Sequence, residues 1–233
     1  MNDAAVMAWL AEQQDPRGIQ HWQKLGAATA GLHSYGIGLT KLRQYAKQLG
    51  RNRALAQQLW QSQCHEAKVL ALLIDDPTQM SRAQAEQQVE QVGAGMLAHV
   101  FASCDATLAK APFVMELAND WLSSEDPLRR ECGYGLLYEI SKFKPKKAPD
   151  DSYFLSQIAR IDQQIAQQPE RVQLAMATAL MGIGKRNKVL NQAAIAVARA
   201  AGPIAFTSAS GNCEPFDVLK HLTAERLQQQ LQS

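Results

Sequence analysis

The sequence of 233 residues has few cysteines, few aromatic residues, no long apolar run and almost no net charge. Its four cysteines form no CxxC pair, which argues against a zinc site or a disulfide framework and is typical of a reducing cytoplasm. No apolar stretch approaches the length of a membrane span, and the N-terminus lacks the basic start and apolar run of a signal peptide. We therefore expect a cytoplasmic protein that binds no membrane, no metal and no cofactor.

The overall charge balance does not by itself predict a class of binding partner. The sequence has 24 lysines and arginines against 22 acidic residues, a net charge of +2. Any basic surface must therefore come from local clustering of like charges.

Helical periodicity of apolar residues runs through almost the whole chain. Two examples are the pair Leu55 and Leu59 and the series from Phe154 to Ile165, which recur at three- and four-residue spacing. Ser81 is placed as an N-cap, and the predicted helices 170–184 and 187–202 each end at a glycine. The pattern predicts an all-α protein with about a dozen helices joined by short loops.

Only one segment, residues 203–209, is a candidate strand, and it is short. Pairs of predicted helices recur every ~35–45 residues, near the period of HEAT and armadillo units. This favours one domain over residues 1–233, an α-solenoid or superhelix of HEAT-like helix pairs whose inner helices line a concave face. An orthogonal helical bundle is the alternative.

Basic residues gather in three segments, residues 40–53, 141–147 and 184–188, each at a helix end or on the loop after it. Phosphate contacts are commonly made at such places. Lysine and arginine are also common at the C-terminal ends of helices, where they interact favourably with the helix dipole and increase solubility. This is the alternative interpretation of any single cluster. Three clusters in a nearly neutral chain favour a nucleic-acid face if the fold brings them together.

Enzyme motifs are mostly absent. The stretch "HEAKV" at 65–69 lacks the second histidine of a zinc-binding helix, so His65 and Glu66 are interpreted as structural, either a buried polar pair or part of the helix surface. No phosphate-binding loop and no GxSxG motif occurs.

Several segments together resemble the DNA alkylation-repair family, the HEAT-like helical-repeat alkylpurine DNA glycosylases. The segments that carry this resemblance are "YGIGLTKLRQYAKQLG", "LAQQLWQSQCHEAKVLALLIDDP", "WLSSEDPLRRECGYGLL", "GIGKRNKVLNQAAIAVARAAG" and "GNCEPFDVLKHL". Their order and spacing match over nearly the whole chain. The resemblance implies a curved stack of helix pairs whose concave, basic face grips duplex DNA.

Active members of this family excise bases with a tryptophan, an aspartate four residues later and an arginine in the helix that follows. The resemblance gives each a role. The carboxylate stabilises the cationic character that develops on the sugar, the aromatic face adds a cation–π contact, and the arginine holds a backbone phosphate.

This sequence departs from that pattern. The segment that corresponds to the tryptophan and aspartate, residues 92–101, contains neither. Asp105 is a substitute carboxylate if Phe101 takes the family aspartate's place, since it would then lie one helical turn on; the alternative is a solvated helix residue. Counting without a gap from Trp121, which we interpret as a core anchor, places Glu131 where the family arginine belongs. Arg129 or Arg130 takes that place only if the loop is one or two residues shorter.

The helix after Trp121 is predicted to begin with Asp126 as N-cap and Pro127 at its first position. Counted at 100° per residue, Arg130 falls opposite the apolar stripe, whereas Arg129 borders it. Arg130 is therefore the better candidate for reaching a ligand.

The leading hypothesis is a monomeric relative of these glycosylases that binds duplex DNA, alkylated or distorted, without base excision. One alternative is an active glycosylase with a rearranged site that uses Asp105 or Glu131, and another is a protein–protein scaffold. The residues predicted to face phosphates are Lys41, Arg43, Lys47, Arg51, Arg130, Lys144, Lys185 and Arg186.

Overall fold

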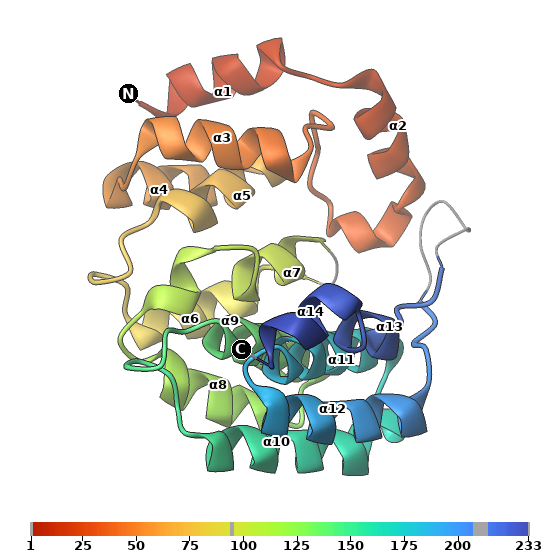
Figure 1. Cartoon of the computed structure of the whole chain (residues 1–233). Coiled ribbons are helices and arrows are strands. Elements are labelled where there is room, and N and C mark those ends of the chain that lie inside the picture. Colours follow the sequence, from red (N-terminus) through yellow and green to blue (C-terminus); the bar gives the residue numbers. More distant parts are fainter. Residues whose placement is uncertain (1, 94–95, 207–213, 233) are drawn as a thin grey trace. The chain divides into compact units, whose positions relative to one another are not determined.

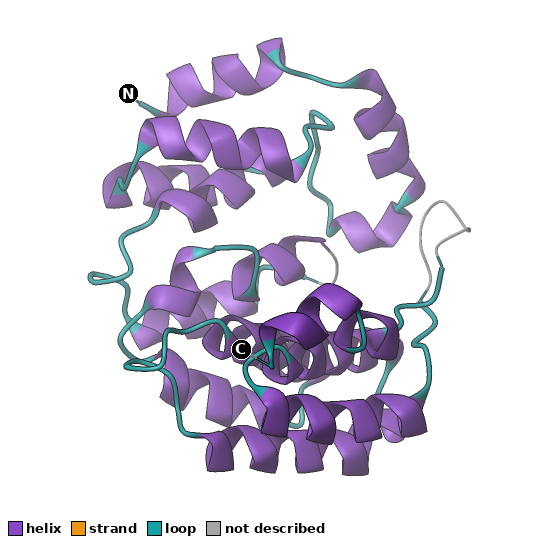
Figure 2. Cartoon of the chain, viewed as in Figure 1, coloured by secondary structure: helices purple, strands orange, loops and turns teal. Residues whose placement is uncertain are grey.

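The computed structural model describes residues 2–93, 96–206 and 214–232 (Figure 1). Within these residues the chain has fourteen α-helices, three short 3-10 helices and no strand (Figure 2). The all-α prediction is confirmed. The strand candidate 203–209 lies partly outside the described residues, and its Ile204 forms a single antiparallel bridge with Phe216. No helix in the described part of the chain is long and apolar enough to cross a membrane.

The chain divides into two compact units, residues 1–117 and 118–233, with the boundary inside helix α8 (Val114–Leu122). The expectation of a single domain over 1–233 stays a prediction. The first unit contains α1 (Asp3–Glu12), α2 (Pro16–Lys24), η1 (Gly26–Thr29), α3 (Leu39–Leu49), α4 (Arg53–Trp60), α5 (His65–Ile74), α6 (Arg82–Val89), α7 (Met96–Ala102) and η2 (Thr107–Lys110).

Helix α5 forms the centre of the first unit and packs against α1, α3, α4 and α7. Its residues from His65 to Leu72 are all buried, as its nearly continuous apolar sequence requires. Glu66 is only 1% exposed. Its carboxylate accepts hydrogen bonds from the Ser34 hydroxyl at 2.6 Å and from the backbone N–H groups of Tyr35 and Ile37 at 3.1 Å. This buried charge therefore fixes the loop that leads into α3, and the structural interpretation of Glu66 is confirmed.

The second unit contains α9 (Pro127–Ser141), α10 (Asp151–Gln164), η3 (Ile165–Gln167), α11 (Glu170–Gly184), α12 (Lys188–Ala201), α13 (Val218–Leu222) and α14 (Glu225–Gln230). Helix α11 packs against α9, α10, α12 and α13. The apolar series from Phe154 to Ile165 on α10 and η3 is buried, as its spacing predicted.

Local capping chemistry is largely as predicted. Ser81 accepts a hydrogen bond from the Gln84 N–H at 3.1 Å, and Asp126 caps α9 with Pro127 at the first helical position. Gly202 ends α12 in a left-handed conformation, with φ of 69°. Helix α11 ends at Gly184 as predicted, and the cap residue that follows is Lys185 rather than a glycine.

Candidate nucleic-acid interface

Two of the three basic segments meet in the second unit. Arg186, directly after α11, donates hydrogen bonds from Nη1 to the backbone carbonyls of Ser141 and Phe143, the latter at 3.2 Å. These carbonyls belong to the C-terminal end of α9, so the segments 141–147 and 184–188 lie next to each other. We call the exposed lysines that they carry the α9/α11 lysine set: Lys144, Lys146, Lys147, Lys185 and Lys188.

Within the described residues, no hydrogen bond or ion pair engages the ammonium groups of the α9/α11 lysine set. Lys142 differs, because its Nζ lies 2.6 Å from a Glu139 carboxylate oxygen and 4.5 Å from the centre of the Tyr138 ring. The charge of Lys142 is therefore largely neutralised, whereas the charges of the α9/α11 lysine set remain available for phosphates.

Arg186, predicted as a phosphate contact, is held by protein groups in the structure. Besides the two carbonyls, its guanidinium lies 4.5 Å from the centre of the Phe154 ring. Burial lowers the pKa of Arg186, against the opposing effect of the Asp151 carboxylate. Carbonyls at the end of a helix have no partner inside the helix, and the fork of an arginine satisfies two of them at once.

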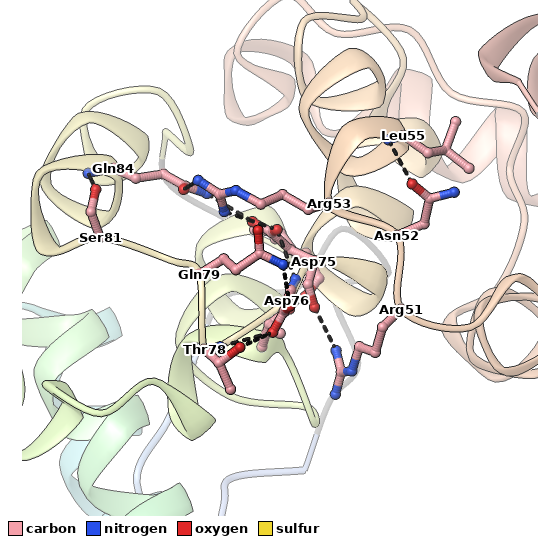
Figure 3. A network of polar contacts seen from close by, with 12 residues as sticks. Arg51, Asn52, Arg53, Leu55, Asp75, Asp76, Thr78, Gln79, Ser81 and Gln84 are labelled. Atoms are coloured by element: carbon pink, nitrogen blue, oxygen red, sulfur yellow. Dashed lines mark hydrogen bonds and ion pairs between the residues drawn. The ribbon is translucent and has the colours of Figure 1, made fainter.

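Arg51, in the first unit, has the same role at the end of α5. Its Nη1 donates to the carbonyls of Leu73 at 3.0 Å and Asp75 at 2.9 Å, as Figure 3 shows in part. Arg53 lies 3.3 Å from a carboxylate oxygen of Asp75, and Gln84 donates to the other carboxylate oxygen at 2.8 Å (Figure 3). Two arginines of the first basic segment thus hold the end of α5.

Only the lysines of that segment stay unengaged. Lys41 and Lys47 are exposed on α3 and take part in no described side-chain hydrogen bond or ion pair. Arg43, on the same helix, lies 3.5 Å from Asp105, which compensates its charge. The α3 lysines belong to the first compact unit and the α9/α11 lysine set to the second, so they are two candidate contact surfaces.

Arg130 is held by the loop before its own helix. It donates from Nη1 to the carbonyls of Ser124 and Glu125 at 2.8 Å and from Nε to the Gln168 side chain at 3.0 Å. The side of α9 opposite the apolar stripe is not a solvent face either, since Tyr134 is 0% and Ser141 4% exposed. The helical wheel misassigned this side, because α9 is buried on both sides for most of its length.

The segment that corresponds to the catalytic tryptophan and aspartate includes α7. Phe101, the expected counterpart of the family aspartate, is fully buried in the core. Helix α7 ends at Ala102, and Asp105 lies beyond it in a left-handed conformation with φ of 66°. Asp105 was expected to be a helix residue, but it is a turn residue. Its exposed carboxylate pairs with Arg43. Trp121 is 1% exposed, which confirms its interpretation as a core anchor.

Glu131, at the place of the family arginine, forms a two-point ion pair with Arg171. The Nε and Nη2 atoms of Arg171 lie 3.1 and 3.2 Å from the two carboxylate oxygens. This carboxylate is 13% exposed and is neutralised by its partner. Sequence reasoning had not singled out Arg171 or Arg160, whose Nη1 donates to the Ser123 hydroxyl at 3.3 Å. No spacing rule finds them, because their partners are 40 and 37 residues away.

Comparison with known proteins agrees with this geometry. In fold, the chain is similar to a solved structure described as a new family of proteins related to the HEAT-like repeat DNA glycosylases with affinity for branched DNA structures. The TM-score is 0.83 over 99% of this chain and 96% of that chain, with 21% sequence identity, which confirms the predicted HEAT-like fold. No curated protein matches the sequence. Residues 6–210 match the family of the DNA alkylation repair enzyme, and the chain therefore belongs to that family.

Proposed function

We propose that this protein binds duplex DNA through exposed lysines and does not excise bases. The observation that carries the proposal is the α9/α11 lysine set, in which two segments about 40 residues apart contribute unpaired ammonium groups to one place. The α3 lysines Lys41 and Lys47 supply a second contact surface. Lysine contacts of this kind hold the phosphate backbone and read no base sequence.

The form of DNA is proposed to be branched or otherwise distorted duplex. The solved structure of similar fold is described as having affinity for branched DNA structures, and this property is carried over to the present chain as part of the proposal. Alkylated duplex is the other candidate form, because of the family.

The absence of base excision is inferred from the residues at the catalytic places. A buried phenylalanine replaces the family aspartate, and Glu131 is bound to Arg171. Neither side chain supplies an unpaired carboxylate beside a sugar, which is what the oxocarbenium-like transition state requires.

Binding titrations test the proposal on three oligonucleotides of equal length: a linear duplex, a four-way junction and a duplex with N-methylated purines. We expect the junction to bind most tightly, with an affinity that falls steeply with salt, since each neutralised phosphate contributes a slope of about −0.9 in log K against log salt. Replacing Lys144, Lys146, Lys147 and Lys185 by glutamine should reduce the magnitude of that slope by about 3.6 if each lysine neutralises one phosphate. Lys142→Gln is the matched control and should change it much less. The absence of binding would refute DNA binding and favour a protein scaffold. Salt-independent binding would refute the proposed lysine contacts to phosphates.

Base excision is tested separately on the methylated duplex. We expect no release of methylated adenine or guanine above the spontaneous rate. Release that is lost in Asp105→Asn or in Glu131→Gln would instead establish a glycosylase with a rearranged site.

A further inference from the structure

A cysteine, a histidine and a serine lie together in the turn after α7. The Cys104 sulfur is 3.1 Å from Nε2 of His99, and the Ser103 hydroxyl is 3.3 Å from Nδ1 of the same ring. A nucleophile and a base within hydrogen-bond reach, with the base positioned by a third group, is the arrangement that activates a thiol. Neither the DNA-binding proposal nor the family comparison uses these residues.

The contact depends on an uncommon backbone conformation. Cys104 and Asp105 are consecutive residues with φ of 59° and 66°, and neither is glycine. This left-handed turn directs the Cys104 side chain back to His99 on the last turns of α7.

The surroundings favour a thiolate. Burial on its own raises the pKa of the Cys104 thiol. The hydrogen bond and charge of His99 outweigh it, with help from Ser103 and Arg43, so that the pKa lies below its ordinary value. The other charged groups nearby are Asp105, which pairs with Arg43, and Lys110, whose ammonium group lies 3.4 Å from the Asp105 carbonyl.

The remaining cysteines of the described residues provide a contrast. Cys64 and Cys132 are both 0% exposed, whereas Cys104 is half-buried. Burial raises the pKa of Cys64 to about 12 and raises that of Cys132 well above its ordinary value. Only Cys104 among these three combines access from solvent with a neighbouring base.

We propose that Cys104, activated by His99, is a peroxide-sensitive modification site of this protein. In the reaction, the thiolate sulfur attacks one oxygen of hydrogen peroxide, a sulfur–oxygen bond forms and the oxygen–oxygen bond breaks. The leaving hydroxide takes the proton of the His99 imidazolium and departs as water, while Cys104 is oxidised to sulfenic acid. The peroxide is reduced in the same step, so that no further reactant is needed.

The test is the rate at which each cysteine reacts with hydrogen peroxide in the folded protein. Dimedone traps the sulfenic acid, and peptide mass spectrometry assigns it to a residue. Cys213, which lies outside the described residues, is replaced by serine in every protein used. We expect Cys104 to be labelled, and the internal controls Cys64 and Cys132 to stay unlabelled. His99→Gln should slow labelling by at least about tenfold, because it removes the group that stabilises the thiolate and supplies the proton.

Two further measurements keep this test decisive. Circular dichroism of His99→Gln should match the parent, since His99 is an exposed residue. The rate of iodoacetamide alkylation of Cys104 should reach its midpoint at a pH below the ~8.5 of an ordinary thiol, and His99→Gln should move that midpoint upward. Equal reactivity of all three cysteines, or an unchanged rate in His99→Gln, would overturn the proposal.

Discussion

Lys185 and Arg186 are adjacent basic residues, and the structure predicts that replacing them has different consequences. Lys185 is an exposed residue whose ammonium group is unengaged within the described residues, although burial lowers its pKa. Arg186, in contrast, bonds two carbonyls of another helix end and lies against Phe154. We therefore expect Arg186→Ala to act on folding stability and Lys185→Ala to act on DNA affinity.

The magnitudes follow from the contacts. A hydrogen bond to a charged group contributes ~1.5–3 kcal/mol, and a partly exposed cation–π contact adds ~0.5–1 kcal/mol. Because both carbonyl bonds come from the single Nη1 atom, we count them once, so removing the Arg186 side chain should cost about 2–4 kcal/mol in the free energy of unfolding. For a chain of this size, 1 kcal/mol corresponds to roughly 2–4 °C in Tm, so Arg186→Ala should lower Tm by about 5–15 °C. Lys185→Ala, a surface change, should stay within about 0.5 kcal/mol of the parent.

The assays are thermal unfolding by circular dichroism and a salt-dependent titration on the four-way junction. Lys185→Ala should reduce the salt slope by about one unit, and Arg186→Ala should leave it almost unchanged at a temperature where the variant is folded. The reasoning fails if Arg186→Ala keeps the parent Tm and lowers the salt slope instead. That result would mean that Arg186 contacts a phosphate, as its sequence alone had indicated.

Two further predictions concern stability. A Cβ on Gly133 would lie 2.8 Å from the backbone nitrogen of Leu122 on the preceding helix, so Gly133→Ala should cost ~1–3 kcal/mol in urea unfolding. Gly38→Ala, where the space is open and φ is −65°, should change stability by less than ~1 kcal/mol, because the weaker N-cap preference of alanine opposes the gain from restricting the unfolded chain. Hydrogen bonds from Thr78 and Gln79 lower the pKa of Asp76. The ionised Asp76 carboxylate therefore stabilises the fold above its unfolded-state pKa of ~3.9, and this stabilisation is lost as the pH falls through its lower folded-state pKa. The stability difference between the parent and Asp76→Asn should therefore shrink below about pH 4, and a difference that persists down to pH 2 would contradict this cause.

What the sequence predicted well depends on neighbours along the chain. The helix start at Ser81, the start of α9 at Asp126 and Pro127, and the buried series on α10 involve partners three or four residues apart. Periodicity and capping rules apply at this range, and so the all-α fold was predictable. The family resemblance supplied the HEAT-like arrangement, which periodicity alone left open.

The roles of the arginines were not predictable in the same way. Arg51 bonds carbonyls 22 and 24 residues away, and Arg186 bonds carbonyls 43 and 45 residues away. A charge count treats each of them as a surface charge, because nothing local marks the carbonyls that the fold brings near. For the same reason, the helical wheel could not show that the Arg130 side of α9 is covered.

The different roles of the arginines, which bond protein groups, and of the lysines, which stay available for a ligand, have a physical basis that is relevant to the proposed function. Arginine presents a planar fork and suits fixed carbonyls at the ends of helices, whereas lysine is a flexible point charge with a hydrated head. Among the eight residues predicted to face phosphates, the four arginines have protein partners, whereas the four lysines have no side-chain partner within the part of the chain that the structure describes. A surface of mobile lysines accommodates phosphates at varying spacing, which a regular duplex does not require but the strands around a DNA branch point do. Replacing the α9/α11 lysine set by arginine should therefore preserve the affinity for linear duplex and reduce the ratio of junction affinity to duplex affinity. An unchanged ratio would show that charge alone determines the preference for the junction.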